Sequence, residues 1–132
     1  MVQRILVAED EPIVAFDLCD TVEEAGYEVE GPFSGVSSAA LASEKEKPDL
    51  AILDITLEDG EVFSLAKRLE ADNVPIIFHS GAHSRDEVAE QFPAATTLIK
   101  PCPPAEMLSA VNTALERTEE EDTHLARATI NV

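Results

Sequence analysis

The sequence predicts an α/β fold in which one sheet of five parallel strands carries helices on both faces. Short apolar runs alternate five times with segments whose apolar residues recur at helical spacing. Runs such as 5–8 and 50–53 are apolar throughout, which is typical of parallel strands that are buried on both faces. Strand–helix–strand units of one sheet cross over in the right-handed sense, so the alternation predicts a doubly wound sheet.

The first two strands and their helix can be placed from apolar runs and breakers. Residues 4–8 form the first strand, and Pro12 suits the first turn of a helix, where its missing amide proton is not needed. Apolar residues then recur at helical spacing until Gly26, which marks the stop. Residues 27–33 form the second strand, whose two glutamates and Pro32 place it at an edge of the sheet.

The remaining elements follow from the same signals. Proline opens three of them, Gly60 breaks the loop 55–60, and apolar stripes mark the helices. In order, we expect a helix at 36–46, a strand at 50–53, a helix at 61–71, a strand that opens at Pro75, a helix at 84–91, a strand at 96–99 and a helix that starts at Pro103-Pro104. Residues 118–132 are acidic and extend the last helix or fray. The chain therefore divides into a domain at 1–117 and an acidic C-terminal extension at 118–132.

An edge position for the second strand gives the strand order 2-1-3-4-5, which is the flavodoxin-like arrangement. In this order the first and third strands are neighbours at the point where the order reverses. Ligands of open α/β sheets bind at that point, beyond the carboxyl ends of the strands. The sequence thus predicts where a functional site lies before any residue is assigned to it.

Composition limits the classes of function. The 132 residues suit one domain with a single core, and 27 acids against 9 bases give a net charge of −18. Such a charge repels nucleic acid, and no apolar stretch approaches the roughly 20 residues of a membrane span. The N-terminus enters a strand directly, and the two cysteines form no CxxC pair, so we expect neither a signal peptide nor a zinc site. A cytoplasmic location is the simplest expectation.

Four of the apolar runs lead to polar residues at their carboxyl ends. Glu9 and Asp10 follow the first strand, Asp54 follows the third, Ser80 the fourth and Lys100 the fifth. Three carboxylates at one edge repel one another, so either one stays protonated or a cation neutralises them. Oxygen ligands suit Mg²⁺, and carboxylates can form acyl phosphates. Lys100 and Mg²⁺ would then stabilise a transferring phosphoryl group, and Ser80 could donate a hydrogen bond to it.

Other kinds of site fit the residues poorly. The turn after the first strand is acidic rather than glycine-rich, which disfavours a dinucleotide site, and no Walker P-loop is present. The residues around Ser80 do not form the GxSxG elbow of serine hydrolases. His79 and His83 beside this serine are more simply ordinary loop histidines than metal ligands.

The chain resembles the receiver domain of two-component response regulators. The resemblance covers about residues 3–117 and depends on four pieces in order: residues 5–12 (ILVAEDEP), Leu53-Asp54, Ser80 and Lys100-Pro101. Each piece alone is weak, but four at the correct strand ends form a specific pattern. Residues 78–83 (FHSGAH) are similar to the Phe-Ala-Thr-Gly-hydrophobic-Tyr motif of one subfamily of single-domain response regulators.

The resemblance implies a role for each site residue. Asp54 would be the phosphoacceptor, Asp10 would bind Mg²⁺ directly, and Glu9 would act on the metal largely through water. The backbone carbonyl of Thr56 would be a further metal ligand, beside Asp54 itself. Lys100 would contact the phosphoryl group.

Two further expectations concern the switch. Ser80 would be the switch hydroxyl that reorients toward the phosphoryl oxygens, and Lys100-Pro101 would be a cis peptide. The sequence also departs from the common pattern. The loop after Asp54 is two residues shorter and lacks proline, and Thr97 replaces the usual switch aromatic. The helix at 84–91 and its flanking loop would then move instead.

The leading hypothesis is a stand-alone receiver rather than an enzyme. Such a receiver catalyses only its own phosphorylation on Asp54 and its slow dephosphorylation. A pseudo-receiver that binds partners without phosphorylation is the first alternative. A Mg²⁺-dependent phosphohydrolase is the second, although Thr56 stands where that class would have another acid. Expected partners are a sensor histidine kinase, with the HWE and related classes as candidates, or a phosphotransfer protein, together with a downstream protein. A homodimer stays open, and no nucleic-acid or membrane partner is expected.

Overall fold

Five parallel strands form the central sheet, in the order β2-β1-β3-β6-β7. The computed structural model describes residues 2–81 and 85–130, from residue 119 onward as helical backbone only. Because a separate short hairpin takes the labels β4 and β5, this order is the predicted 2-1-3-4-5, and β2 lies at the predicted edge. The flavodoxin-like fold is therefore confirmed.

The observed elements match the predicted ones closely. The strands are β1 (Arg4–Ala8), β2 (Glu28–Phe33), β3 (Leu50–Leu53), β6 (Ile76–Ser80) and β7 (Thr96–Ile99), with the hairpin strands β4 (Thr56–Leu57) and β5 (Gly60–Glu61). The helices are α1 (Pro12–Glu24), α2 (Val36–Lys45), α3 (Phe63–Ala71), α4 (Arg85–Gln91) and α5 (Pro104–Ile130). Ser84, the predicted start of the fourth helix, lies outside the described residues.

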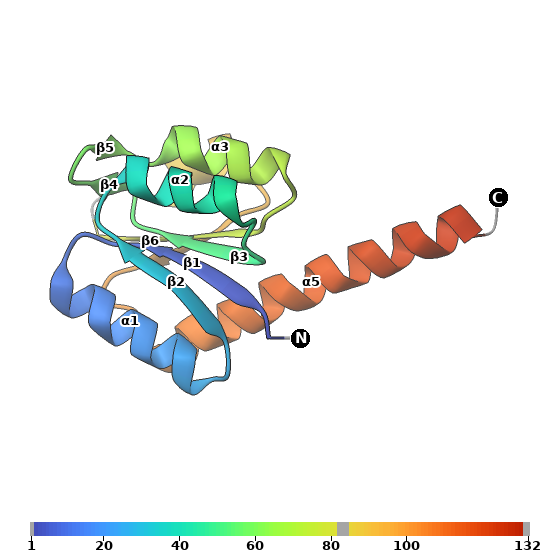
Figure 1. Cartoon of the computed structure of the whole chain (residues 1–132), viewed down its shortest axis with the longest axis horizontal. Coiled ribbons are helices and arrows are strands. Elements are labelled where there is room, and N and C mark those ends of the chain that lie inside the picture. The colour runs from blue at the N-terminus through green and yellow to red at the C-terminus, as the bar shows by residue number, and fades with distance from the viewer. Residues whose placement is uncertain (1, 82–84, 131–132) are drawn as a thin grey trace.

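Helices cover both faces of the sheet, which explains the continuous apolar runs. Figure 1 shows α2 and α3 on one face and α1 with α5 on the other. Along β1, Leu6 packs in the core under α2 and α3, whereas Val7 packs in the core under α1 and α5. Both side chains are fully buried. Alternate residues of one strand thus enter two different cores, so every position is apolar.

The hairpin after β3 was not predicted. Thr56 pairs with Glu61, and Leu57 pairs with Gly60, which has φ of +134°. Because Glu61 belongs to this hairpin, the third helix begins at Phe63 rather than at 61. A two-residue strand is too short to show a hydrophobic period, so the sequence carried no signal for it.

The last helix is longer than the domain that it completes. Helix α5 runs to Ile130 and, in Figure 1, projects well beyond the sheet. Of the two predicted outcomes for this segment, the structure therefore shows extension of the helix over 118–130. None of the helices in the described part of the chain is both long enough and apolar enough to cross a membrane.

Candidate functional site

Backbone hydrogen bonds bring three strand ends to one place. The amide of Asp54 donates to the carbonyl of Ala8, 2.9 Å away, which holds the end of β3 beside the end of β1. The amide of Lys100 donates to the carbonyl of Ser80 at 3.1 Å, which holds the end of β7 beside that of β6. The side chains that follow these strands therefore share the carboxyl edge of the sheet, as predicted.

The ammonium of Lys100 lies among three carboxylates at this edge of the sheet. Its Nζ lies 2.6 Å from Oε1 of Glu9, 3.1 Å from Oδ2 of Asp54 and 3.3 Å from Oε1 of Glu11. The Glu9 and Asp54 side chains are only 1% and 10% exposed, whereas that of Glu11 is 63% exposed. A single lysine thus faces two buried carboxylates and one at the surface.

The electrostatics of this group are unbalanced. Burial raises the pKa of Glu9 to about 7, although the Lys100 ammonium lowers it. Burial opposes the charge of Lys100, but the carboxylates of Glu9 and Asp54 outweigh it and raise the lysine pKa. One positive charge cannot neutralise three carboxylates, so the site favours a further cation or a proton.

The same acids could hold a metal ion. Glu9, Glu11 and Asp54 each offer a carboxylate oxygen, and these oxygens all lie within 4.8 Å of one another. Oxygen-only donors suit Mg²⁺, which takes one or two carboxylates and keeps several waters. The donor set of this acidic cluster therefore fits that ion.

Glu11 was missed as a site residue in the sequence interpretation. It stands at the start of α1, where its amide donates to Oε2 of Glu9 at 3.2 Å, and its side chain reaches back to Lys100. The signal was present, because Glu11 continues the acidic run Glu9-Asp10. Only the turn between strand and helix determines which of these acids face the lysine.

The other predicted residues lie near this edge with different surroundings. Asp10 is half-buried and lines a hollow between α1 and β2, and it is not among the three clustered acids. Thr56 is exposed in the hairpin, and Ser80 is buried at the end of β6. The Lys100-Pro101 peptide is cis, as the resemblance implied. The ligand roles of Asp10 and Thr56 and the switch role of Ser80 stay predictions.

The interpretation of His79 as a loop histidine was wrong. His79 lies inside β6, where it pairs with Leu98 of β7, and only 6% of it is exposed. A polar residue after an apolar run was taken as the strand exit, but β6 continues to Ser80. His83 lies outside the described residues.

Comparison with known proteins decides the family. Residues 5–112 match the family described as response regulator receiver domain. The chain belongs to this family. Receivers are signalling modules of two-component systems rather than enzymes of the ordinary kind.

This receiver is similar to parts of longer regulators. It is 30% identical over 121 residues to the transcriptional regulatory protein PdtaR of Mycobacterium tuberculosis, a match of 89% of this chain and 59% of PdtaR. It is 34% identical over 118 residues to the phyllosphere-induced regulator PhyR of Methylorubrum extorquens, with 87% and 44% covered. The chain thus spans about half the length of these curated relatives.

A solved structure shows the same architecture. The CheY-like response regulator receiver domain protein of Methanospirillum hungatei superimposes with a TM-score of 0.83 and 26% identity. The match covers 92% of this receiver and 99% of that chain. The elements that position the acidic site therefore belong to the shared fold.

Proposed function

We propose that this receiver accepts a phosphoryl group on Asp54 from a phosphohistidine of a sensor kinase or phosphotransfer protein. The reaction is Mg²⁺-dependent, and the phosphorylated domain, residues 1–117, signals through changed protein contacts. The observation that supports this proposal most directly is the Lys100 ammonium, 3.1 Å from the Asp54 carboxylate in a largely buried site. A cation at that place can stabilise a phosphoryl group attached to the same carboxylate.

The chemistry needs few groups. A carboxylate oxygen of Asp54 attacks phosphorus, the bond between phosphorus and the donor nitrogen breaks, and the imidazole leaves with that electron pair. The product is an acyl phosphate. Lys100 then faces the phosphoryl oxygens and keeps its contact with Glu9. Bound Mg²⁺ would be held by Glu9 and Asp54, with Asp10 and the Thr56 carbonyl as predicted ligands, and would supply positive charge to the phosphoryl oxygens.

Surface features support a protein partner. Ile13 and Phe16 on α1 are 79% and 71% exposed, beside the strand-end site. Large apolar side chains at the surface are suited to contact with another protein. A partner that brings its phosphohistidine to Asp54 would cover these residues, so we assign phosphodonor docking to this end of α1.

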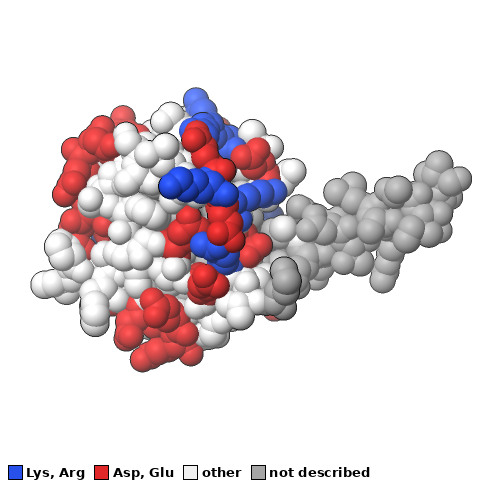
Figure 2. All heavy atoms as spheres, in the orientation of Figure 1, with Lys and Arg blue, Asp and Glu red and all other residues white. Residues whose placement is uncertain are grey.

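The charge distribution disfavours nucleic acid as a partner. Figure 2 shows Lys and Arg in one band in which acidic residues interleave. Among the described residues, Arg4 pairs with Glu30 and Glu46, and Arg68 pairs with Glu44. Paired bases are not free to neutralise phosphates, and the net charge of −18 repels them.

The proposal is tested by phosphorylation with a small donor. We expect acetyl phosphate and Mg²⁺ to add the mass of one phosphoryl group to the intact chain, and chelation of Mg²⁺ to abolish the addition. Asp54→Asn should remove it, whereas the control Asp72→Asn, at an exposed position after α3, should not. An unmodified wild-type chain in the presence of Mg²⁺ would contradict the proposal and favour the phosphorylation-independent binding module.

A further inference from the structure

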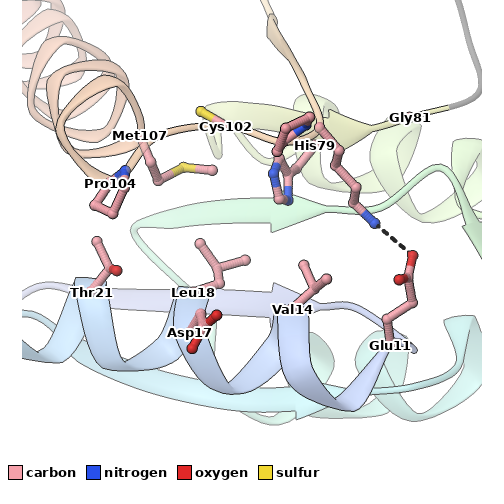
Figure 3. A pocket seen from close by; sticks show the side chains of 12 residues that line it. Glu11, Val14, Asp17, Leu18, Thr21, His79, Gly81, Cys102, Pro104 and Met107 are labelled. Carbon is pink, nitrogen blue, oxygen red and sulfur yellow. Dashed lines mark hydrogen bonds and ion pairs between the residues drawn. The ribbon is translucent and has the colours of Figure 1, made fainter.

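A cavity lies beside the proposed phosphorylation site, between α1 and the start of α5. Its volume is about 520 Å³, within the range of roughly 300–1,000 Å³ that small-molecule sites occupy. Val14 and Leu18 of α1 form one wall, and Met107 of α5 forms another (Figure 3). Most of the lining is apolar, so the cavity suits a ligand with a hydrophobic body.

One polar side chain faces into this apolar space without a partner. His79 is 94% buried, being 6% exposed, and neither ring nitrogen has a hydrogen-bond partner among the described residues. Figure 3 shows its imidazole facing Val14 and Leu18 across the cavity. A buried polar group without a partner costs about 1–3 kcal/mol, which a bound hydrogen-bonding group would recover.

The state of the imidazole determines what it can bind. Burial lowers the pKa of His79, and the Lys100 charge lowers it further, so the ring is neutral near pH 7. A neutral imidazole offers one N–H donor and one nitrogen acceptor. The imidazole therefore matches a ligand group that can both accept and donate a hydrogen bond, such as a hydroxyl or a primary amide.

We propose that this cavity binds a small neutral aromatic molecule that carries a hydroxyl or amide group. The aromatic body packs against the apolar side chains and against the sulfur atom of Met107, because a thioether makes favourable contacts with rings. The polar group hydrogen-bonds to His79. The carboxylates of Glu11 and Asp17 on the same lining disfavour an anionic ligand.

Ligand binding would be coupled to the acidic site. Lys100 and Glu11 line the cavity and also take part in the ion-pair cluster with Asp54. A ligand that shifts either side chain changes the environment of Asp54 and therefore the equilibrium of its phosphorylation. By linkage, phosphorylation changes the affinity for the ligand by the same factor as the ligand changes that equilibrium. Binding does not require phosphorylation, so it is tested in the unphosphorylated protein without Mg²⁺.

The experiment compares phenol with toluene, which has a similar size but no hydroxyl. Each is titrated into the ¹⁵N-labelled full chain, and amide shifts of residues around the cavity and the ring-nitrogen shifts of His79 are followed. We expect saturable shifts with phenol, a Kd on the order of 1 mM, and clearly weaker binding of toluene. Absence of saturable shifts with phenol, or equal affinity for the two molecules, would overturn the proposal.

Variants show whether the cavity and His79 are responsible. His79→Phe keeps an aromatic ring but removes the nitrogens, and should weaken phenol binding about tenfold and abolish its advantage over toluene. Val14→Trp should fill the cavity and prevent binding, whereas Ile13→Trp, exposed on the same helix, should not. Folding of each variant is checked from its amide spectrum. Unchanged phenol affinity in folded His79→Phe, or equal effects of the two tryptophans, would refute the site.

Discussion

Replacement of Lys100 by methionine tests the electrostatic account of the acidic site most directly. Methionine keeps much of the length of the side chain but removes the ammonium that faces Glu9 and Asp54 at 2.6 and 3.1 Å. The Glu9 and Asp54 side chains are 99% and 90% buried, being 1% and 10% exposed, so water cannot replace the lost cation. The variant therefore holds two close carboxylates without a counter-charge.

The expected loss of stability depends on pH. Removal of one partner from a buried ion pair costs about 3–5 kcal/mol, and partial exposure of Lys100 places this variant near the lower value. We therefore expect the free energy of unfolding at pH 8 to fall by about 3 kcal/mol. At lower pH Glu9 can bind a proton and remove part of the repulsion, so the loss near pH 5.5 should be about half as large.

The direction in which the stability loss changes with pH follows from the pKa of Glu9. Its pKa is already raised from 4.5 to about 7 in the native protein, and loss of the lysine raises it further. Between the unfolded and folded values, the folded state binds more protons than the unfolded state. The contribution of Glu9 to stability therefore decreases as pH rises through this window, and the deficit of the variant increases.

Urea unfolding at pH 5.5 and pH 8 measures the loss of unfolding free energy at each pH. Lys67→Met is the matched control, because Lys67 is exposed on α3 and its replacement should change stability by less than about 0.5 kcal/mol. Addition of Mg²⁺ should restore more stability to Lys100→Met than to the wild type, since the ion supplies the missing charge. A loss that is the same at both pH values, or no larger than that of the control, would refute the reasoning.

Three further predictions concern the scaffold around the site. Phe92→Ala should lower the free energy of unfolding by about 3–5 kcal/mol in urea titrations, because Phe92 is fully buried and contacts two other rings; a loss below about 1 kcal/mol would contradict this packing. Gly31→Ala should cost more than about 1 kcal/mol in the same assay, because φ is +118° and a Cβ would lie 2.6 Å from the Val7 carbonyl oxygen. Wild-type stability of this variant would show that the backbone there can relax. Asp59→Ala should speed amide exchange at the start of α2, where the Asp59 carboxylate accepts hydrogen bonds from the amides of Val36 and Ser37. Unchanged exchange at these amides would show that water replaces the cap without loss.

Features with a local physical cause could be predicted from the sequence. The strands at 4–8, 50–53 and 96–99 agree residue for residue with the structure. Residues 5–8 and 50–53 are apolar throughout because both faces of these strands are buried. The charges and Pro32 that weaken the second strand placed it at the edge, and this position determined the strand order. The order in turn brought Asp54 and Lys100 to the correct edge.

Other features depend on contacts between segments that are distant in the chain. The hairpin at 56–61 forms within a shortened loop that has no periodic pattern. Glu11 reaches Lys100, 89 residues away, only because α1 starts where the end of β7 approaches it. His79 looked like the first residue of a loop, yet its neighbours across the sheet extend the strand past it.

The sequence predicts the fold, the order of the strands and the edge at which the functional residues gather. These properties follow from hydrophobic periodicity, turn residues and strand connectivity, all of which are local in the chain. The three-dimensional arrangement is needed to show which acids face Lys100, how deeply Glu9 is buried and that His79 faces an apolar cavity. Side-chain direction and burial depend on every element packed around a residue, so the sequence near that residue cannot determine them.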